Sequence, residues 1–413
     1  MLHGSVTADA FKARTRVYGR ALRLQWQPVI LPTLVLWTVG TVISCTLLHP
    51  FDVVEYQGYA HAALRAPLLQ RLPAEYPSPA LVVFWLPLLL PLSYPWAFAV
   101  ISGVVLLFLV TSYDGVNVPG MDREAARRLV VYLTVGACFL VTARYDIFAA
   151  AAAFWALRAA LRDRWSAAWT WSAVGCVLKI FPAVFWPAFL IAEWRRHGRF
   201  PLRRLAWVGA SAVVLAALPA LFDHADLLNT LHFYARRPDE MEGLPAGLSL
   251  LVEWSRTTVV HSFHSVNVVN AVARPMGTIV GAVAVVGCVG TWWVQARGRI
   301  PMEAACLLSL TLAVLGSKVG SAQYLIWLMP LWAMYPVNPQ WLMAGVANLM
   351  AFPYGASGAE GLLSTRSFID SLMLVLLARN LLIAWGTWTW FRSLRPQRRA
   401  VPATPSVVGG IRG

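Results

Sequence analysis

The stretch VILPTLVLWTVGTVISCTLL, residues 29–48, runs directly into HPFDVVEY, residues 49–56, and this transition organises the chain. The first part carries no charged side chain and is about as long as the ~20 residues that a helix needs to cross a bilayer. Similar apolar runs recur as far as Trp390. Because a bilayer offers the backbone no hydrogen-bonding partners, such continuous runs predict helices rather than alternating barrel strands.

The composition points to the same class of protein. Of the 413 residues, 58% are hydrophobic and only 13% are charged, whereas typical soluble domains have about 25% charged residues. We therefore predict an all-α, polytopic integral membrane protein with about twelve transmembrane helices, within roughly eleven to thirteen, and with helices in its extracytoplasmic loops. The five cysteines lie in apolar runs and none pairs at a metal-ligand spacing, so we expect no metal site.

The excess of basic residues sets the expected orientation in the membrane. The net charge is +15, with 34 Lys and Arg against 19 Asp and Glu. The basic residues form short clusters between apolar runs, as the positive-inside rule produces, and this pattern argues against nucleic-acid binding. Residues 1–27 are basic, so we place them in the cytoplasm with the 393–413 tail, which we expect to be disordered. Residues 28–392 would form the transmembrane domain.

Two outer loops follow from this orientation. They span residues 49–78 and 222–273, and the second has an acidic balance unlike that of the inner loops. Residues 79–112 do not fit, because they are too long for one crossing and the sequence Leu92-Ser93-Tyr94-Pro95 breaks them. Two crossings there would invert every later assignment, so either the half from Pro79 to Pro91 is re-entrant or a later boundary differs.

Polar side chains gather at the expected outer ends of the apolar runs. Carboxylates beside a bilayer are costly to bury and are functional candidates by default. We expect these positions to converge on one cavity at the outer membrane surface. They are Asp52, Glu55, Tyr56, Glu75 and Tyr76 in the first loop, Arg144 and Asp146 in the next outer turn, Lys179 at a helix break, His224, His232, Arg236, Arg237, His261 and His264 in the long loop, and Lys318, Gln323 and Tyr324 at the mouth of a late helix.

These residue types suit one kind of reaction. A carboxylate can take a proton from an attacking hydroxyl, and Lys and Arg can stabilise the charge on a departing phosphate. Transfer of a sugar from a polyprenyl phosphate needs both functions and access from the membrane. Asp52 is the first candidate for the base and Glu55 is the second.

Four short motifs in the first half and one late motif resemble those of a family of membrane enzymes. They are Phe51-Asp52…Tyr56, Glu75-Tyr76-Pro77-Ser78-Pro79, Arg144-Tyr145-Asp146, Leu178-Lys179-Ile180-Phe181-Pro182, and Ser317-Lys318…Ser321-Ala322-Gln323-Tyr324-Leu325-Ile326-Trp327-Leu328-Met329-Pro330. With them the sequence is similar to the GT-C membrane glycosyltransferases, and most closely to glycosyltransferase family 87, the polyprenyl-phosphate-mannose-dependent mannosyltransferases. The family's Tyr-Pro-Pro reads Tyr76-Pro77-Ser78-Pro79 here.

The resemblance implies a GT-C-like fold and a metal-independent, inverting transfer of a hexose, with mannose expected, at the extracytoplasmic face of the plasma membrane. The donor would be a polyprenyl-phosphate-linked sugar in the membrane lipid and the acceptor a glycolipid or glycan, with no cofactor. Asp52 would act as general base. Donor-phosphate contacts would come from Lys318, Arg144, His264 and Lys179, and sugar or acceptor contacts from Tyr56, Glu75, Tyr76, Asp146, Gln323 and Tyr324.

These residues also have structural interpretations, and other functions stay open. Asp52 could cap a helix, and Arg144 with Asp146 could form an interfacial ion pair. Lys179 and Lys318 could simply extend their ammonium groups to the interface. The protein could instead be a transporter or flippase of lipid-linked sugars, an arabinofuranosyltransferase or a non-catalytic scaffold. A transporter predicts inverted repeats and charges at the bilayer midplane, whereas the apolar runs are almost free of charge.

Overall fold

The computed structural model describes residues 27–47, 51–65, 75–114, 120–217, 232–233, 235–351 and 366–394. The predictions about the basic N-terminus before residue 27, the tail after residue 394, residues 66–74 of the first outer loop and most of the segment 218–234 therefore lie outside the described residues. His224 lies outside them as well.

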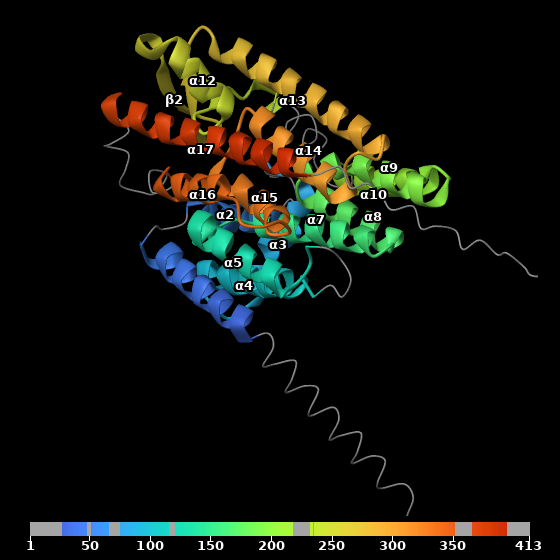
Figure 1. The fold of residues 1–413 in the computed structure, drawn as a ribbon. Coiled ribbons are helices and arrows are strands. Elements are labelled where there is room, and N and C mark those ends of the chain that lie inside the picture. The colour runs from blue at the N-terminus through green and yellow to red at the C-terminus, as the bar shows by residue number, and fades with distance from the viewer. Residues whose placement is uncertain are drawn as a thin grey trace, which may run out of the picture.

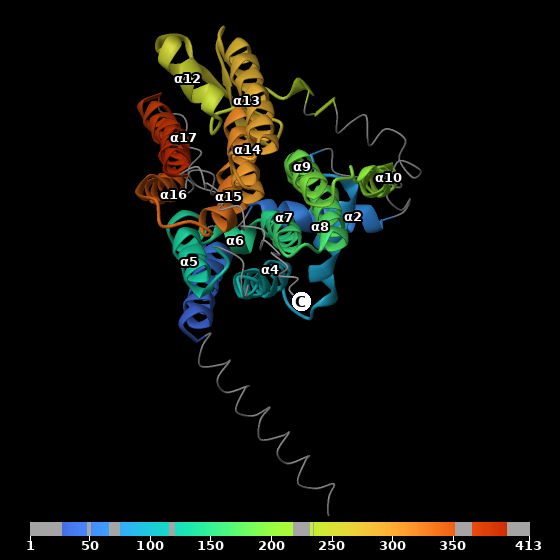
Figure 2. The ribbon, with the colours of Figure 1, turned by 45° about the vertical axis from the view of Figure 1, so that its right-hand side comes forward.

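The described chain is predominantly helical, and helices α12, α13 and α17 lie to one side of the N-terminal helices in both views (Figures 1 and 2). The first helix covers Gln27–Thr46. The following helices are α2 (Phe51–Leu64), α3 (Leu81–Trp85), α4 (Tyr94–Thr111), α5 (Arg123–Ala137), α6 (Leu140–Ala143), α7 (Asp146–Leu161), α8 (Trp165–Leu178), α9 (Trp186–His197), α10 (Leu202–Ala217), α12 (Leu244–Val252), α13 (Ala273–Ala296), α14 (Met302–Gly316), α15 (Leu325–Trp332), α16 (Pro339–Ala351) and α17 (Arg366–Ser393).

Among the described residues, four helices are long and apolar enough to cross a membrane. They are Gln27–Thr46, Tyr94–Thr111, Ala273–Ala296 and Ser367–Ser393, and their side chains are largely exposed on one face. Apolar side chains on an exposed face suit contact with lipid better than contact with water. The chain is thus a helical protein with segments suited to a membrane, in agreement with the coarse fold prediction.

The predicted break in residues 79–112 is confirmed. A short apolar helical stretch, Ser78–Leu89, ends before an extended residue, Leu90, and α4 begins at Tyr94 with a proline at its first turn. Proline disfavours a helical conformation in the residue before it and is tolerated at the start of a helix, which explains why the chain turns here. The first half is shorter than a transmembrane span, which needs ~20 residues.

Helix α7 connects two ends of the molecule. It is rich in alanine and buried along most of its length against α4, α8 and α15, because small side chains let neighbouring helices approach closely. Its first residue, Asp146, lies among the predicted outer positions. Toward its other end, about 18 and 24 Å away by the helical rise, Arg158 and Arg162 donate to the Asp114 carbonyl. Asp146 and this basic cluster therefore lie at opposite ends of one helix, while the orientation in the membrane stays a prediction.

A three-stranded antiparallel sheet interrupts the helical fold in the long loop. Strand β3 (Ser265–Val269) pairs with both β1 (Asp239–Glu240) and β2 (Thr258–Ser262). The hairpin between β2 and β3 turns at Phe263 and His264, which have φ values of 53° and 55°. The sequence analysis did not predict this sheet, although the β-branched residues of its strands are typical of β structure.

Candidate functional site

Asp52 and Arg144, both predicted to lie at the outer face, form an ion pair in the structure. Asp52 lies in the first turn of α2, where a negative charge is stabilised by the helix dipole. Arg144 follows α6 with an extended backbone, and its guanidinium forms an ion pair with the Asp52 carboxylate. The two side chains are 19% and 18% exposed, so the pair is sheltered but still accessible from outside.

Acidic residues of a third segment surround the same arginine. Glu240 and Glu242 lie within electrostatic range of Arg144, and Arg237 forms an ion pair with Glu240 at 2.9 Å. Burial raises the pKa of Glu240 to about 8, because its charged form loses contact with water. Arg144 therefore lies between carboxylates from α2 and from the segment around β1.

A second ion pair is buried two residues further along the chain. Lys179, which ends α8, places its Nζ 2.7 Å from Asp146 Oδ1, and Trp327 Nε1 donates to the same oxygen at 2.7 Å. The Lys179 ammonium also lies 4.8 Å from the ring centre of Tyr145 and 5.6 Å from that of Tyr324, distances typical of cation–π contacts. Lys179, Asp146 and Tyr324 thus form one compact unit with Trp327. Trp327 belongs to the late motif, but the sequence analysis did not single it out.

Two of the three tyrosines predicted to contact sugar or acceptor, Tyr56 and Tyr76, lie in an aromatic cluster. Tyr56 of α2 is fully buried and stacks on Phe84 with ring centres 4.5 Å apart. Tyr76 packs edge-on against Tyr145 at 5.2 Å. Such pairs stabilise packing beyond the burial of their area. The cluster holds α2 against the turn that carries Arg144, while direct sugar contacts by these tyrosines stay a prediction.

The loop with the late motif packs directly on the segment around β1. The Lys318 carbonyl accepts a hydrogen bond from the Glu240 amide at 2.9 Å. Gly320 has a φ of +55°, and a Cβ there would lie 2.6 Å from the Gly243 Cα, so only glycine fits. Gln323 follows, and its buried Oε1 has no hydrogen-bond partner among the described residues. The loop with Lys318 and Gln323 is therefore joined to the segment around β1 through its backbone, since the Ala322 amide also donates to Glu242 Oε2.

Arg379 of α17, which the sequence analysis missed, connects these two loops. It is 1% exposed and donates to the carbonyls of Glu242 at 2.6 Å and Gly320 at 2.5 Å, and to Asn348 Oδ1 at 2.9 Å. A lone arginine in an apolar helix is a signal of function or of internal pairing. Its donors are used within the protein, so we assign it the role of holding the two loops together.

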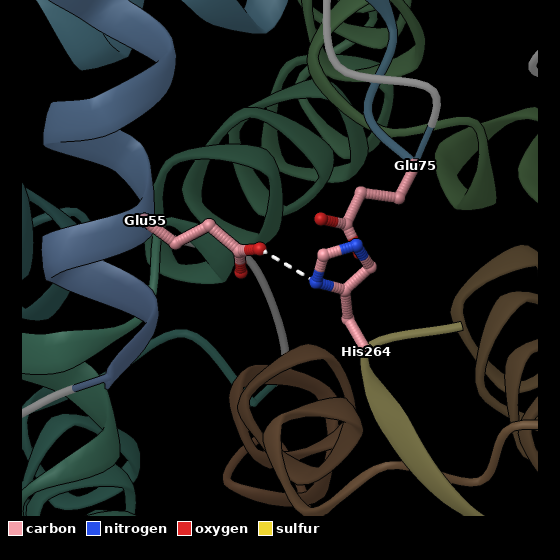
Figure 3. Close-up of side chains that lie close together, drawn as sticks. All are labelled: Glu55, Glu75 and His264. Atoms are coloured by element: carbon pink, nitrogen blue, oxygen red, sulfur yellow. Dashed lines mark ion pairs between the residues drawn. The ribbon is translucent and has the colours of Figure 1, made fainter. Parts of the chain in front are cut away.

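The remaining acidic positions of the first loop meet the tip of the hairpin (Figure 3). His264 Nδ1 lies 3.0 Å from Glu55 Oε1. The Tyr59 hydroxyl lies 3.1 Å from Glu55 Oε1 and 2.5 Å from Glu75 Oε1. Burial and the neighbouring Glu75 raise the pKa of Glu55, because both effects disfavour its charged form. Glu55, Glu75 and His264 are the residues of this region that could hold a metal ion.

The other residues of the long loop lie outside this assembly or at its edge. His232, Arg236 and His261 are exposed. Arg237 is the exception, through its ion pair with Glu240. Most of the predicted outer positions that the structure describes are thus brought together, in two neighbouring groups. One is built around Arg144 and the other around Glu55.

Comparison with known proteins gives no further guidance. No protein-family model, curated protein or solved structure matches the chain. The resemblance to glycosyltransferase family 87 therefore stays a prediction from its motifs. The functional interpretation depends on the geometry of the residues described above.

Proposed function

We propose that the chain is an integral membrane glycosyltransferase of the GT-C type. It would move a hexose, with mannose expected, from a polyprenyl-phosphate donor to a glycolipid or glycan acceptor. The observation that carries this proposal is the accessible ion pair of Asp52 and Arg144, a base and a phosphate ligand held side by side. In this proposal the chain has about twelve spans in the plasma membrane and an extracytoplasmic site.

Asp52 and Arg144 would separate as the donor binds. The donor phosphate competes for the Arg144 guanidinium, since arginine binds phosphate and carboxylate oxygens in the same bidentate manner. Asp52, released from part of this contact, accepts the proton of the acceptor hydroxyl. The hydroxyl oxygen forms a bond to the anomeric carbon while the carbon–phosphate oxygen bond breaks, and the phosphate leaves with the electron pair. A single displacement of this kind inverts the anomeric configuration.

The cations around the pair would bind the departing phosphate. Arg144 carries the first contact, and we assign a second positive charge to Lys318, whose backbone carbonyl accepts from the Glu240 amide and whose ammonium lies within electrostatic range of Asp239. Charges aimed at the leaving group lower the barrier because they need little rearrangement during the reaction. Lys179 is held by Asp146 and three aromatic rings, so it contributes through its field rather than through direct contact.

Gln323 and its neighbours would bind the sugar. A buried oxygen without a partner costs free energy, and a ligand hydroxyl that donates to it removes this cost. Gln323 Oε1 is such an oxygen among the described residues, and the half-buried Tyr324 follows it in the chain. The Trp327 ring is stacked between Phe181 and Tyr324, so it would support the Tyr324 ring rather than contact the sugar.

The test is a donor screen with purified protein in nanodiscs. Radiolabelled polyprenyl-phosphate mannose, glucose and arabinofuranose are supplied with a glycolipid fraction, and label in the acceptor is measured. We expect transfer from one hexosyl donor. Absence of transfer from every donor, with folded protein and both substrates present, would refute the proposal.

A transporter is the second candidate, because Arg379 places a charge in the middle of an apolar helix, as transporter sites do. Its donors are already used by Glu242, Gly320 and Asn348, however, which favours a structural role. Movement of a labelled lipid-linked sugar across sealed vesicles, without transfer of the sugar, would favour this candidate instead.

A further inference from the structure

A mixed cluster of Glu55, Glu75 and His264 lies beside the proposed catalytic pair but has no part in the reaction described above. The three residues come from α2, from the segment before Ser78, and from the tip of the β2–β3 hairpin. We propose that this cluster binds a divalent transition-metal ion, such as zinc or manganese, which fastens the hairpin to α2. The proposal goes beyond the glycosyl transfer and does not depend on it.

The spacing of the side chains suits one ion. One ligand atom from each residue lies within 4.8 Å of the others, and Glu55 Oε1 is 3.0 Å from His264 Nδ1. Two ligand atoms at about 2.1 Å from a shared metal, at the angles of octahedral or tetrahedral coordination, are about 3.0 to 3.4 Å apart. One pair is therefore already at coordination distance, and the Glu75 carboxylate lies beside the same imidazole (Figure 3).

The backbone of the hairpin turn brings the histidine to this place. Both central residues of the turn, Phe263 and His264, have positive φ values. Tight hairpin turns of this kind strongly prefer Asn-Gly or Asp-Gly, because other residues are disfavoured at positive φ. Phe263 packs against Phe233 with ring centres 5.2 Å apart, and His264 extends from the other side of the turn toward α2. The unfavourable conformation thus places an imidazole opposite two carboxylates.

The chemistry of the donors selects the class of metal. Imidazole nitrogen favours zinc and related transition metals, and carboxylates also suit manganese, whereas sites for magnesium and calcium use oxygen ligands alone. Two carboxylates would neutralise the charge of a divalent ion and remove the repulsion that now acts between Glu55 and Glu75. The Tyr59 hydroxyl contacts both carboxylates, in the position of an outer partner that orients metal ligands.

An ion bound by this cluster would affect the neighbouring pair of Asp52 and Arg144 through helix α2. Glu55 lies three residues after Asp52, so the two side chains share one face of α2. An ion bound by Glu55 and His264 would fix that face relative to the hairpin. It would do so without contacting Asp52 or Arg144.

The experiment measures bound metal directly, with the full-length protein in nanodiscs. The protein is stripped with EDTA, incubated separately with zinc, manganese, magnesium and calcium chlorides, and desalted before elemental analysis. We expect about one zinc or manganese ion per chain, and retention lowered at least about tenfold in His264→Ala and Glu75→Gln. His261→Ala is the matched control, because this exposed histidine lies on the same hairpin outside the cluster.

Thermal unfolding supplies a second measurement that does not depend on activity. Zinc or manganese should raise the unfolding temperature of the wild type and of His261→Ala but not of His264→Ala, since a ligand that binds only the folded state stabilises it. If His264→Ala fails to fold, Glu75→Gln, which keeps the size of the side chain, decides the question. Equal retention of metal by the wild type and the variants, or none by the wild type, would overturn the proposal and leave a hydrogen-bonded histidine–carboxylate contact.

Discussion

Arg144 and Asp146 lie two residues apart in the chain, and each forms an ion pair with a residue of another segment. The two pairs differ in burial. Arg144 pairs with Asp52, and both side chains are about one-fifth exposed. Asp146, which is completely buried, pairs with Lys179 and with the Trp327 indole. The same pairing of charges thus serves two purposes. In the proposed reaction the accessible pair exchanges partners with a substrate, whereas the buried Asp146 carboxylate joins α7 to Lys179 after α8 and to Trp327 of α15.

Removal of the accessible carboxylate should have the largest effect on activity. Asp52→Asn keeps the shape of the side chain but cannot accept a proton, so we expect sugar transfer to fall about 10²- to 10⁴-fold. The measurement is label transferred from the donor found in the screen. Asp122→Asn is the control, because this N-cap residue of α5 lies outside the site and Asn caps helices equally well. Full activity of Asp52→Asn would remove it from the base role.

The buried pair should instead respond through stability. Asp146→Asn leaves the Lys179 charge without its partner in a buried place, and such losses cost about 3–5 kcal/mol of unfolding free energy. Loss of solubilised, folded protein and a lower unfolding temperature are the readouts. The double variant Asp146→Asn with Lys179→Met removes both charges and should recover much of the stability. If Asp146→Asn unfolds like the wild type while activity is lost, the difference between the two pairs disappears.

The helical, membrane-type fold and the convergence of outer positions could be predicted from sequence. Long apolar runs require helices in a bilayer, and polar residues at run ends on one side have to meet there. This reasoning brought Asp52, Arg144 and Glu55 into one region, where the structure also places them. The predicted break before Pro95 followed from the geometry of proline.

The choice of partners could not be predicted in the same way. Asp146 and Lys179 are 33 residues apart in sequence, and nothing local indicates that they pair with each other. Arg379 is a buried charge in the middle of an apolar helix, and its role depends on two loops far away in the chain. The hairpin that carries His264 consists of two five-residue strands, too short for a clear periodic pattern. The Asp146–Lys179 pair, the role of Arg379 and the position of the hairpin all depend on contacts between distant segments.

Substitution of Lys318 tests the site around the accessible pair, with a smaller expected effect on activity. Lys318→Ala removes one charge near the proposed phosphate, and hydrogen bonds to charged groups contribute about 1.5–3 kcal/mol, so donor KM should rise about tenfold or more. The fold should be kept, because the loop is held through the Lys318 carbonyl and Gly320 rather than through the ammonium. Titration of the donor in the transfer assay measures the change. Unchanged donor affinity would assign Lys318 to the interface alone.

Asp239 provides an intermediate case, a buried carboxylate without a cation in direct contact, and the smallest expected effect. Its Oδ2 has no hydrogen-bond partner among the described residues. A side chain at Gly277 would collide with the Asp239 carboxylate, so glycine is needed there. Burial raises its pKa from 3.8 to about 6, although the charge of Lys318 opposes this shift. An acid whose pKa is raised on folding stabilises the folded state fully below pH 4, and this contribution is lost as the pH rises through 6.

The wild type should therefore lose unfolding temperature between about pH 4 and 6 relative to Asp239→Asn, in which this group does not titrate. Thermal unfolding of both proteins in nanodiscs across this range measures the difference. Glu124→Gln, an exposed change on α5, controls for the general effect of removing a carboxylate. Because Asp239 is buried like Asp146 but has no cation in direct contact among the described residues, parallel pH curves would mean that burial does not shift the titration of this carboxylate.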